Sequence, residues 1–138
     1  MRTRSRTARY SLIVKFILDP PGNAQFIRAY GEGQVRVGSR TLKRSCIVAA
    51  DRLIEDWSVT DVTQLGSGDF EPVFALEPEV VILGTGRVQR FPPAEVRWAF
   101  ARRALALEVM DLGAACRTYN VLLQDQRRVV AALVIASG

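Results

Sequence analysis

The chain has 138 residues, of which 49% are hydrophobic and 24% are charged, the proportions of one globular domain rather than of a disordered or membrane-spanning chain. It contains no histidine. This absence excludes Ser–His and Cys–His nucleophile pairs and nearly all histidine-based zinc and iron sites. We therefore expect no metal and no cofactor.

The net charge of +5 is concentrated at the N-terminus, where Arg2, Arg4, Arg6 and Arg9 supply four of these charges. Residues 1–9 are therefore predicted to form a basic flexible arm, and residues 10–138 a single α/β domain. Such an arm is typical of a solvated tail, and a phosphate- or membrane-seeking role is the alternative. No nucleic-acid motif accompanies the arm, so we expect no specific nucleic-acid partner.

The apolar stretch 10–18 is too short to span a bilayer and is interrupted by Lys15. No small-residue cleavage site follows it closely, so we read no secretory signal and no transmembrane segment. The cytoplasm is the expected compartment. A start rich in Arg, Ser and Thr without acidic residues also fits a mitochondrial transit peptide, which makes the mitochondrial matrix the alternative.

The first half of the chain has the pattern of an antiparallel sheet. Residues 26–30 and 34–38 alternate in polarity around Gly31-Glu-Gly33, which is typical of a β-hairpin. Further short strands are predicted at 40–42, at 45–49 and in the segment up to Trp57. Capping residues then predict a short helical turn at 60–63 and a helix from Gly66 to Leu76 that ends before Pro78.

The second half alternates strands and helices. Strands are predicted at 80–83, 107–111 and 129–135, and helices at 93–104 and 114–123. A β-α-β-α-β order specifies right-handed crossovers and a parallel or mixed sheet. The run 129–135 is continuously apolar, so we expect it to be a central strand covered on both faces.

Two glycine turns follow the strands at 80–83 and 107–111, and they would meet at one edge of the sheet if these strands are parallel. Three arginines and the N-terminus of the following helix would surround that edge, an arrangement that suits a carboxylate or phosphate group. A structural arginine network is the alternative. The predicted anion- or ligand-binding residues are Gly84, Thr85, Gly86, Arg87, Arg90, Gly113, Arg117, Tyr119 and Asn120.

The Gly84-Thr-Gly86 turn is a poor dinucleotide fingerprint, because Gln89 occupies the third glycine position and the next helix starts too late. A tight turn that requires a positive φ is the better interpretation. The polar side chains of Tyr119 and Asn120 are predicted either to face the same recess or to satisfy local backbone groups.

Cys116 and Trp98 have competing interpretations. The first turn of the helix and Arg117 would favour a Cys116 thiolate, a candidate reactive thiol. Without a histidine base, a small packing residue is the alternative. Trp98 lies beside the apolar stripe of its helix, so it either packs in a secondary core or serves as a candidate interface anchor for another protein.

Several motifs carry a family pattern: Gly31-Glu-Gly33, Leu83-Gly-Thr-Gly86, Arg90-Phe-Pro-Pro93, and Glu108-Val-Met-Asp111 leading into residues 113–120. In these motifs, and over residues 26–135, the chain resembles a small single-domain family that includes mitochondrial complex I assembly factor three and bacterial and archaeal proteins of undefined activity. Leu112 departs from the pattern, which commonly has threonine there, so a hydroxyl that could cap the helix or contact a ligand is missing.

The resemblance implies a three-layer α/β fold on a central mixed sheet, and a role in assembling a respiratory membrane complex rather than in catalysis. No catalytic residues are carried over. We therefore predict a non-enzymatic binding or assembly protein with protein partners, which could include subunits of a membrane complex. Self-association into a homodimer through edge strands stays open. The rival is an anion- or small-molecule-binding protein or enzyme that uses the glycine edge.

Overall fold

The computed structural model describes residues 13–15 and 24–135. The predicted basic arm, residues 1–9, lies outside the described residues. Four strands form an antiparallel sheet, sheet A, in the order β1-β2-β3-β4. These strands are β1 (Ile13–Lys15), β2 (Ile27–Gly31), β3 (Gln34–Val37) and β4 (Arg40–Leu42). The predicted hairpin is therefore β2-β3, and it turns at Gly33 with a φ of 68°.

Five strands form a mixed sheet, sheet B, in the order β6-β5-β9-β7-β8. The strands β7, β8 and β9 are parallel to one another, whereas β5 is antiparallel to both of its neighbours. Strand β9 is central and fully buried, as its continuous apolar sequence predicts. The bounds are β5 (Cys46–Ala49), β6 (Arg52–Ile54), β7 (Val80–Gly84), β8 (Ala106–Met110) and β9 (Val129–Leu133).

The strand order determines on which face each crossover helix lies. The crossover from β7 to β8 runs toward one edge of the sheet through α2 (Ala94–Arg102). The crossover from β8 to β9 runs in the opposite direction through α3 (Leu112–Gln124). Since both crossovers are expected to be right-handed, the reversal of direction places α2 and α3 on opposite faces of sheet B.

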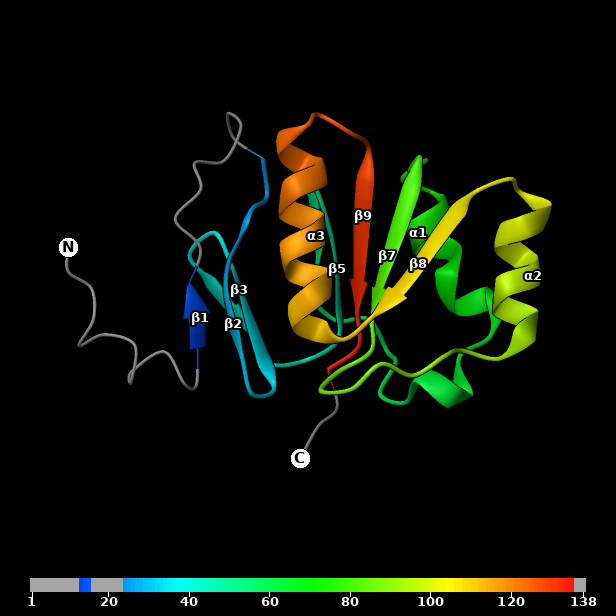
Figure 1. The fold of residues 1–138 in the computed structure, drawn as a ribbon, viewed down its shortest axis with the longest axis horizontal. Coiled ribbons are helices and arrows are strands. Elements are labelled where there is room, and N and C mark those ends of the chain that lie inside the picture. The colour runs from blue at the N-terminus through cyan, green and yellow to red at the C-terminus, as the bar shows by residue number, and fades with distance from the viewer. Residues whose placement is uncertain (1–12, 16–23, 136–138) are drawn as a thin grey trace.

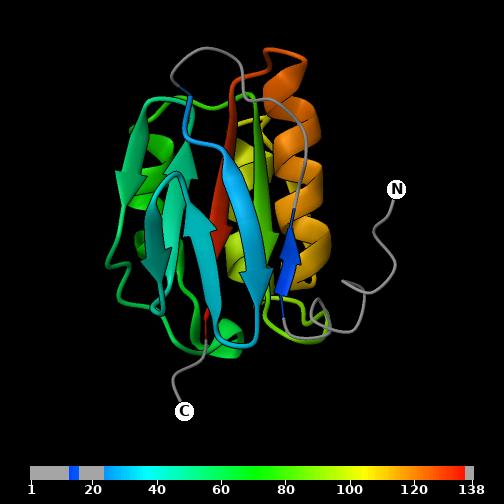
Figure 2. The ribbon, with the colours of Figure 1, turned by 90° about the vertical axis from the view of Figure 1, so that its left-hand side faces the viewer.

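The three layers follow from this arrangement (Figure 1). Sheet A and α3 lie side by side and cover one face of sheet B, as the turned view shows (Figure 2). The other face is covered by α2 together with η3 (Val62–Gln64), η4 (Ser67–Phe70) and α1 (Glu71–Phe74). The predicted fold class, a three-layer α/β fold with a central mixed sheet, is confirmed.

Each face of sheet B has its own hydrophobic core. The core under α3 and sheet A includes the fully buried side chains of Phe26, Ile82 and Leu133. The core under α2 and the short helices is built around aromatic rings. Phe70 packs edge-on against Trp57 and Phe100, with ring centroids 5.6 Å and 5.1 Å away.

Predicted and observed elements of the second half agree to within two residues at most boundaries. The predicted helix at 114–123 begins earlier, at Leu112, because Asp111 caps it. The predicted strand at 129–135 ends at Leu133. The two residues after it stay buried, and the Val134 N–H donates to the Gly84 carbonyl.

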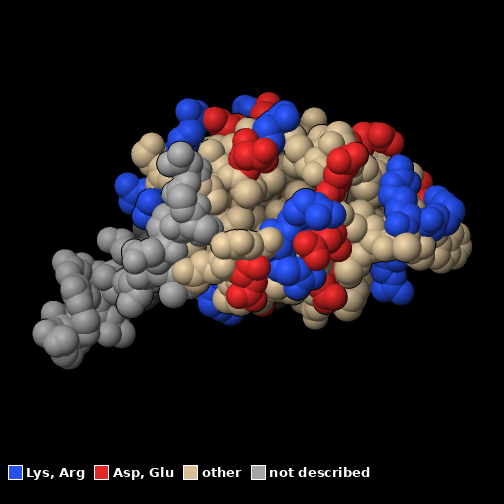
Figure 3. Space-filling model, turned by 90° about the horizontal axis from the view of Figure 1, so that it is seen from above, with Lys and Arg blue, Asp and Glu red and all other residues tan. Residues whose placement is uncertain are grey.

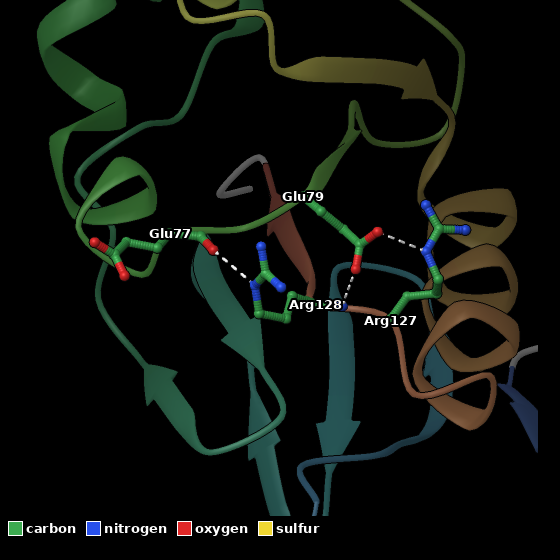
Figure 4. Close-up of polar contacts among 4 residues, drawn as sticks. All are labelled: Glu77, Glu79, Arg127 and Arg128. Carbon is green, nitrogen blue, oxygen red and sulfur yellow. Dashed lines mark hydrogen bonds and ion pairs between the residues drawn. The ribbon is translucent and has the colours of Figure 1, made fainter.

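The N-terminal ends of β7 and β9 are joined by a polar cluster on the surface (Figure 4). The Glu79 carboxylate accepts hydrogen bonds from the Arg128 backbone N–H and from Arg127 Nε, both at 2.9 Å. Arg128 Nε donates in turn to the Glu77 carbonyl oxygen at 3.2 Å. The Arg128 N–H, and then the Arg127 guanidinium, lower the pKa of Glu79 from its ordinary value of about 4.5.

This lowered pKa predicts a pH dependence of stability. Ionised Glu79 stabilises the fold above its ordinary pKa, and this contribution is lost as the pH falls through the lowered pKa of the folded state. The free energies of unfolding of the wild type and of Glu79→Gln, measured with urea, should therefore differ at pH 7, and the difference should shrink as the pH falls below the ordinary pKa of Glu79. A difference in stability between the two proteins that stays constant as the pH falls would show that Glu79 does not contribute to the acid sensitivity of the fold.

Candidate functional site

The two glycine turns do meet at one edge of sheet B. Strands β7 and β8 are parallel neighbours, with Gly84 opposite Met110. The Thr85 N–H donates to the Met110 carbonyl at 2.9 Å, and the Leu112 N–H donates to the Gly86 carbonyl at 2.7 Å. The edge at which open α/β sheets commonly bind ligands is thus closed here by hydrogen bonds between the two turns.

Thr85 organises the first turn from a buried position. Its hydroxyl oxygen lies 2.7 Å from the Val88 carbonyl, to which it donates, and it accepts from the Arg90 N–H at 3.0 Å. Gly86 adopts a φ of 94°, in the region that favours glycine, so the interpretation as a tight turn holds at this position. Gly84 has a different reason to be glycine.

Gly84 and Gly113 are sites of close approach. A Cβ atom added to Gly84 would lie 2.9 Å from both the Ala115 Cβ and the Leu133 Cδ2. A Cβ atom added to Gly113 would lie 2.8 Å from the Tyr30 ring. The first glycine lets α3 lie tightly on β7 and β9, and the second lets the start of α3 pack against sheet A.

These two glycines predict a contrast in stability. We expect Gly84→Ala to destabilise the protein by about 1–3 kcal/mol, because its neighbours are a helix methyl group and a core leucine that cannot move away. Gly113→Ala should cost less than about 1 kcal/mol, because the contact is with the far end of the Tyr30 side chain, which can swing away, and alanine favours a helix. Urea unfolding of both variants measures the difference, and equal losses would contradict the packing argument.

The N-terminus of α3 already holds a carboxylate of its own chain. Asp111 is the N-cap residue, and its Oδ1 accepts from the Ala114 N–H at 2.9 Å. This carboxylate does the capping that the missing threonine hydroxyl at position 112 would have offered. Leu112 is instead buried in the core beneath α3. The positive end of the helix dipole is therefore partly compensated before any external anion binds.

The remaining predicted ligand residues are one buried pair and three arginines. Tyr119 and Asn120 are buried and face β2: the Tyr119 hydroxyl donates to the Gln25 carbonyl at 2.7 Å, and the Asn120 amide pairs with the Ile27 backbone. Arg117 donates to the Tyr30 hydroxyl. Arg87 and Arg90 are exposed on the first turn. The anion-binding prediction now rests on these last two arginines, and it stays a prediction.

Both cysteines are free and buried. Burial raises the pKa of the Cys46 thiol to about 12. Burial also raises the pKa of the Cys116 thiol, and this effect is larger than the opposing one of Arg117. The packing interpretation of Cys116 fits its position between α3 and the sheet.

The structure has a cavity of about 430 Å³ beside the glycine edge, between α2 and β8. None of the predicted site residues lines it. We call this cavity the α2–β8 groove, and its lining residues are Phe91, Arg97, Phe100, Ala101, Leu105, Leu107, Glu108 and Val109. The groove is thus mainly apolar and carries one arginine and one glutamate.

Exposed apolar side chains are concentrated in the segment 88–98, which includes two of the residues that line this groove, Phe91 and Arg97. Phe91 is 58% exposed, Trp98 is 62% exposed and Val88 is 55% exposed. The Arg97 guanidinium lies 6.0 Å from the centroid of the Phe91 ring. Trp98 is one helical turn from Ala101, so it borders the groove. The structure therefore places Trp98 on the surface rather than in a secondary core.

Sequence reasoning missed the groove because it depends on strand order. The alternation of strands and helices does not say whether a strand is central or at an edge of the sheet, and β8 is at the edge. One signal was available. Phe91 and Val88 are large apolar residues outside any predicted helix or strand, where exposure is the usual outcome.

Two further observations concern the part of the chain that the structure describes. None of its helices is long and apolar enough to cross a bilayer. No group of three or more His, Cys, Asp or Glu side chains is placed there to hold a metal ion.

Comparisons with known proteins place this fold in a family. The 13 kDa major membrane protein of Francisella tularensis is 24% identical over 79% of this chain and 89% of its own. The bovine NADH dehydrogenase [ubiquinone] 1 alpha subcomplex assembly factor 3 is 30% identical over 83% of this chain. The chain spans 63% of that factor's length.

A solved structure of a protein from Xanthomonas campestris has the same fold. It is 39% identical, with a TM-score of 0.74, over 79% of this chain and 83% of that one. A family model matches residues 27–134, which include every strand and helix from β2 to β9. The chain belongs to the family described as protein of unknown function (DUF498/DUF598).

Proposed function

We propose that this protein acts by binding another protein, as a non-enzymatic assembly protein, through the surface formed by Val88, Phe91 and Trp98. The observation that carries the proposal is the concentration of these exposed side chains in one segment of the chain. Three of the four exposed large hydrophobic residues in the described part of the chain lie within the segment 88–98. Exposed aromatic residues that lie together are typical of protein interfaces.

The names of the relatives support a proposal about which kind of partner the protein binds. The bovine relative is named as an assembly factor for NADH dehydrogenase, so we extend to this chain a role in assembling a respiratory membrane complex through contacts with its subunits. The compartment, cytoplasm or mitochondrial matrix, belongs to the same proposal and would be that of the partner.

The residues on the surface suit reversible contact. Phe91 and Trp98 offer large rigid rings that lose little conformational entropy when buried. Neither ring belongs to the two hydrophobic cores, so both can be truncated without opening a cavity in the fold. The binding role can therefore be tested separately from folding.

The test is affinity purification of the tagged chain from its native cells, followed by binding measurements with the purified partner. We expect Phe91→Ala and Trp98→Ala each to weaken binding by about 30-fold, the effect of a typical interface hot spot. The matched control is Val121→Ala, which removes an exposed apolar side chain from α3, 53% exposed, and should leave the affinity unchanged.

Two results would contradict the proposal. Unchanged affinity in both aromatic variants would remove this surface from the interface. Turnover of a small metabolite by the purified protein, abolished by substitution of Arg117 or Cys116, would instead identify an enzyme at the glycine edge.

A further inference from the structure

Strand β8 is the edge of sheet B, and its free side borders the α2–β8 groove. We propose that β8 accepts an extended acidic segment of the partner protein as an additional strand, with an apolar side chain of that segment in the groove. This inference rests on the proposed function, because it describes how the partner of that function is held. Strand addition at a sheet edge is a common mode of peptide recognition.

The hydrogen bonds of β8 show which of its backbone groups point outward. In a strand, the N–H and C=O of successive residues point to alternate sides. The Met110 carbonyl accepts from Thr85 on the β7 side. The backbone groups of Leu107 and Val109 must then point to the open side. The Val109 carbonyl is indeed reached from that side by Gln89 Nε2, at 2.8 Å.

The Gln89 contact shows what an added strand would replace. An exposed side-chain amide donates to an edge carbonyl, as the backbone N–H of a neighbouring strand would. Among the described strands, β8 is the one nearest the viewer in Figure 1, with α2 standing beside it and no element drawn across its free side. The strand carries a single charged residue, Glu108, so it lacks the lysines and prolines that commonly protect an exposed edge.

The groove gives the added strand a place for a side chain. Leu107 and Val109 are half-buried, and they line the groove together with Phe100 and Leu105. Their side chains lie on the α2 face of the sheet, as their contacts with the aromatic core show. An apolar side chain on the same face of a neighbouring strand would lie over this floor, beside Phe91.

The excess of arginine in the segment 87–108 favours an acidic partner. Residues 87–108 include five arginines and two glutamates. None of these arginines forms an ion pair with any residue that the structure describes. Figure 3 shows Lys and Arg gathered at the α2 end of the molecule. The arginines are Arg87, Arg90, Arg97, Arg102 and Arg103, all exposed.

A second copy of this chain fits the same edge poorly. Antiparallel self-pairing centred on Glu108 would place two glutamates opposite each other, which is destabilising. It would also bring the arginines of both copies together. An acidic segment avoids the second obstacle, since its charge complements that of the five arginines, and it avoids the first when a neutral residue lies opposite Glu108.

The test uses the full chain and synthetic peptides, with amide hydrogen exchange as the readout. The probe is an acetylated and amidated peptide with a central Val-Thr-Val that is flanked by glutamates, so that the threonine lies opposite Glu108, and the control peptide has lysines in place of the glutamates. We expect the acidic peptide to slow exchange of the Leu107 and Val109 amides by about tenfold or more, while the Glu108 amide, already paired with β7, stays unchanged. The lysine peptide should slow neither amide.

Protein variants test the charge argument. Arg97→Glu should weaken binding of the acidic peptide by about tenfold. The matched control is Arg36→Glu, which reverses an exposed arginine on β3 in sheet A and should leave binding unchanged. In a further control, every second backbone amide of the acidic peptide is N-methylated, which removes its hydrogen bonds to β8. This peptide should not slow the exchange of the Leu107 and Val109 amides.

The outcomes separate this inference from the proposed function. Partner binding that depends on Phe91 and Trp98 but leaves the Leu107 and Val109 amides exchanging freely would overturn strand addition and leave the proposed function standing. The acidic peptide could instead slow exchange at Leu107 and Val109 but not at Glu108, while Phe91→Ala and Trp98→Ala leave partner binding unchanged. That result would overturn the proposed surface and support strand addition at β8. Protection that rises with protein concentration alone would identify a second copy and overturn the acidic partner.

Discussion

Asn120→Leu is expected to destabilise the protein by about 3–5 kcal/mol, one of the two largest losses that we predict for a single substitution. The Asn120 side chain forms two hydrogen bonds with the backbone of Ile27. Its Oδ1 accepts from the Ile27 N–H at 3.1 Å, and its Nδ2 donates to the Ile27 carbonyl at 2.8 Å. Both residues have no exposed surface, so leucine would leave two buried backbone groups without partners.

Urea unfolding measures this loss, which corresponds to a melting temperature lower by about 10 °C or more. Val121→Ala is the control from the same helix, because Val121 is exposed, and it should change stability by less than about 0.5 kcal/mol. Asn120→Asp should also be costly, since a carboxylate can accept from the Ile27 N–H but repels its carbonyl. A leucine variant as stable as the wild type would show that water or a shifted β2 can satisfy the Ile27 backbone.

Phe70→Ala is expected to cost a similar amount, about 3–5 kcal/mol, for a different reason. Phe70 is fully buried at the end of η4, in edge-on contact with the Trp57 and Phe100 rings. Alanine would leave a cavity among rings that are held by other contacts. Trp57, for example, is fixed by a 2.8 Å hydrogen bond from its Nε1 to the Asp69 carbonyl.

The matched control for Phe70→Ala is the same chemical change at Phe91, which is 58% exposed. Phe91→Ala should alter the free energy of unfolding by less than about 0.5 kcal/mol. The two variants thus separate folding from binding, because Phe91 is expected to matter for the partner alone. A small loss at Phe70 would mean that the surrounding rings collapse to fill the space.

The fold could be predicted largely because hydrophobic periodicity is a local signal. The continuous apolar run at 129–135 identified β9 as a central strand, and the alternation of strands and helices specified the parallel arrangement of β7, β8 and β9. The meeting of the Gly84 and Gly113 turns also followed, because parallel strands bring their carboxyl ends to one edge.

The rest depended on contacts between residues far apart in the sequence. Nothing near Asn120 says that its amide will pair with Ile27, which lies 93 residues earlier in the chain. From the sequence, the side chains of Tyr119 and Asn120 could either face the recess at the glycine turns or form hydrogen bonds with local backbone groups. The structure places both against β2, whose approach to α3 is a tertiary contact and therefore has no local signal.

The position of β9 in sheet B has a consequence for synthesis of the chain on the ribosome. This strand joins β5 to β7, although residues 46–49 and 80–84 are made well before residues 129–133. Until β9 has been made, β5 and β7 belong to two separate groups of strands. Each of these two apolar strands then lacks the neighbour that it has in the folded sheet. Closure of the large sheet is therefore expected to be a late event, and stalled or truncated products would be natural clients for chaperones.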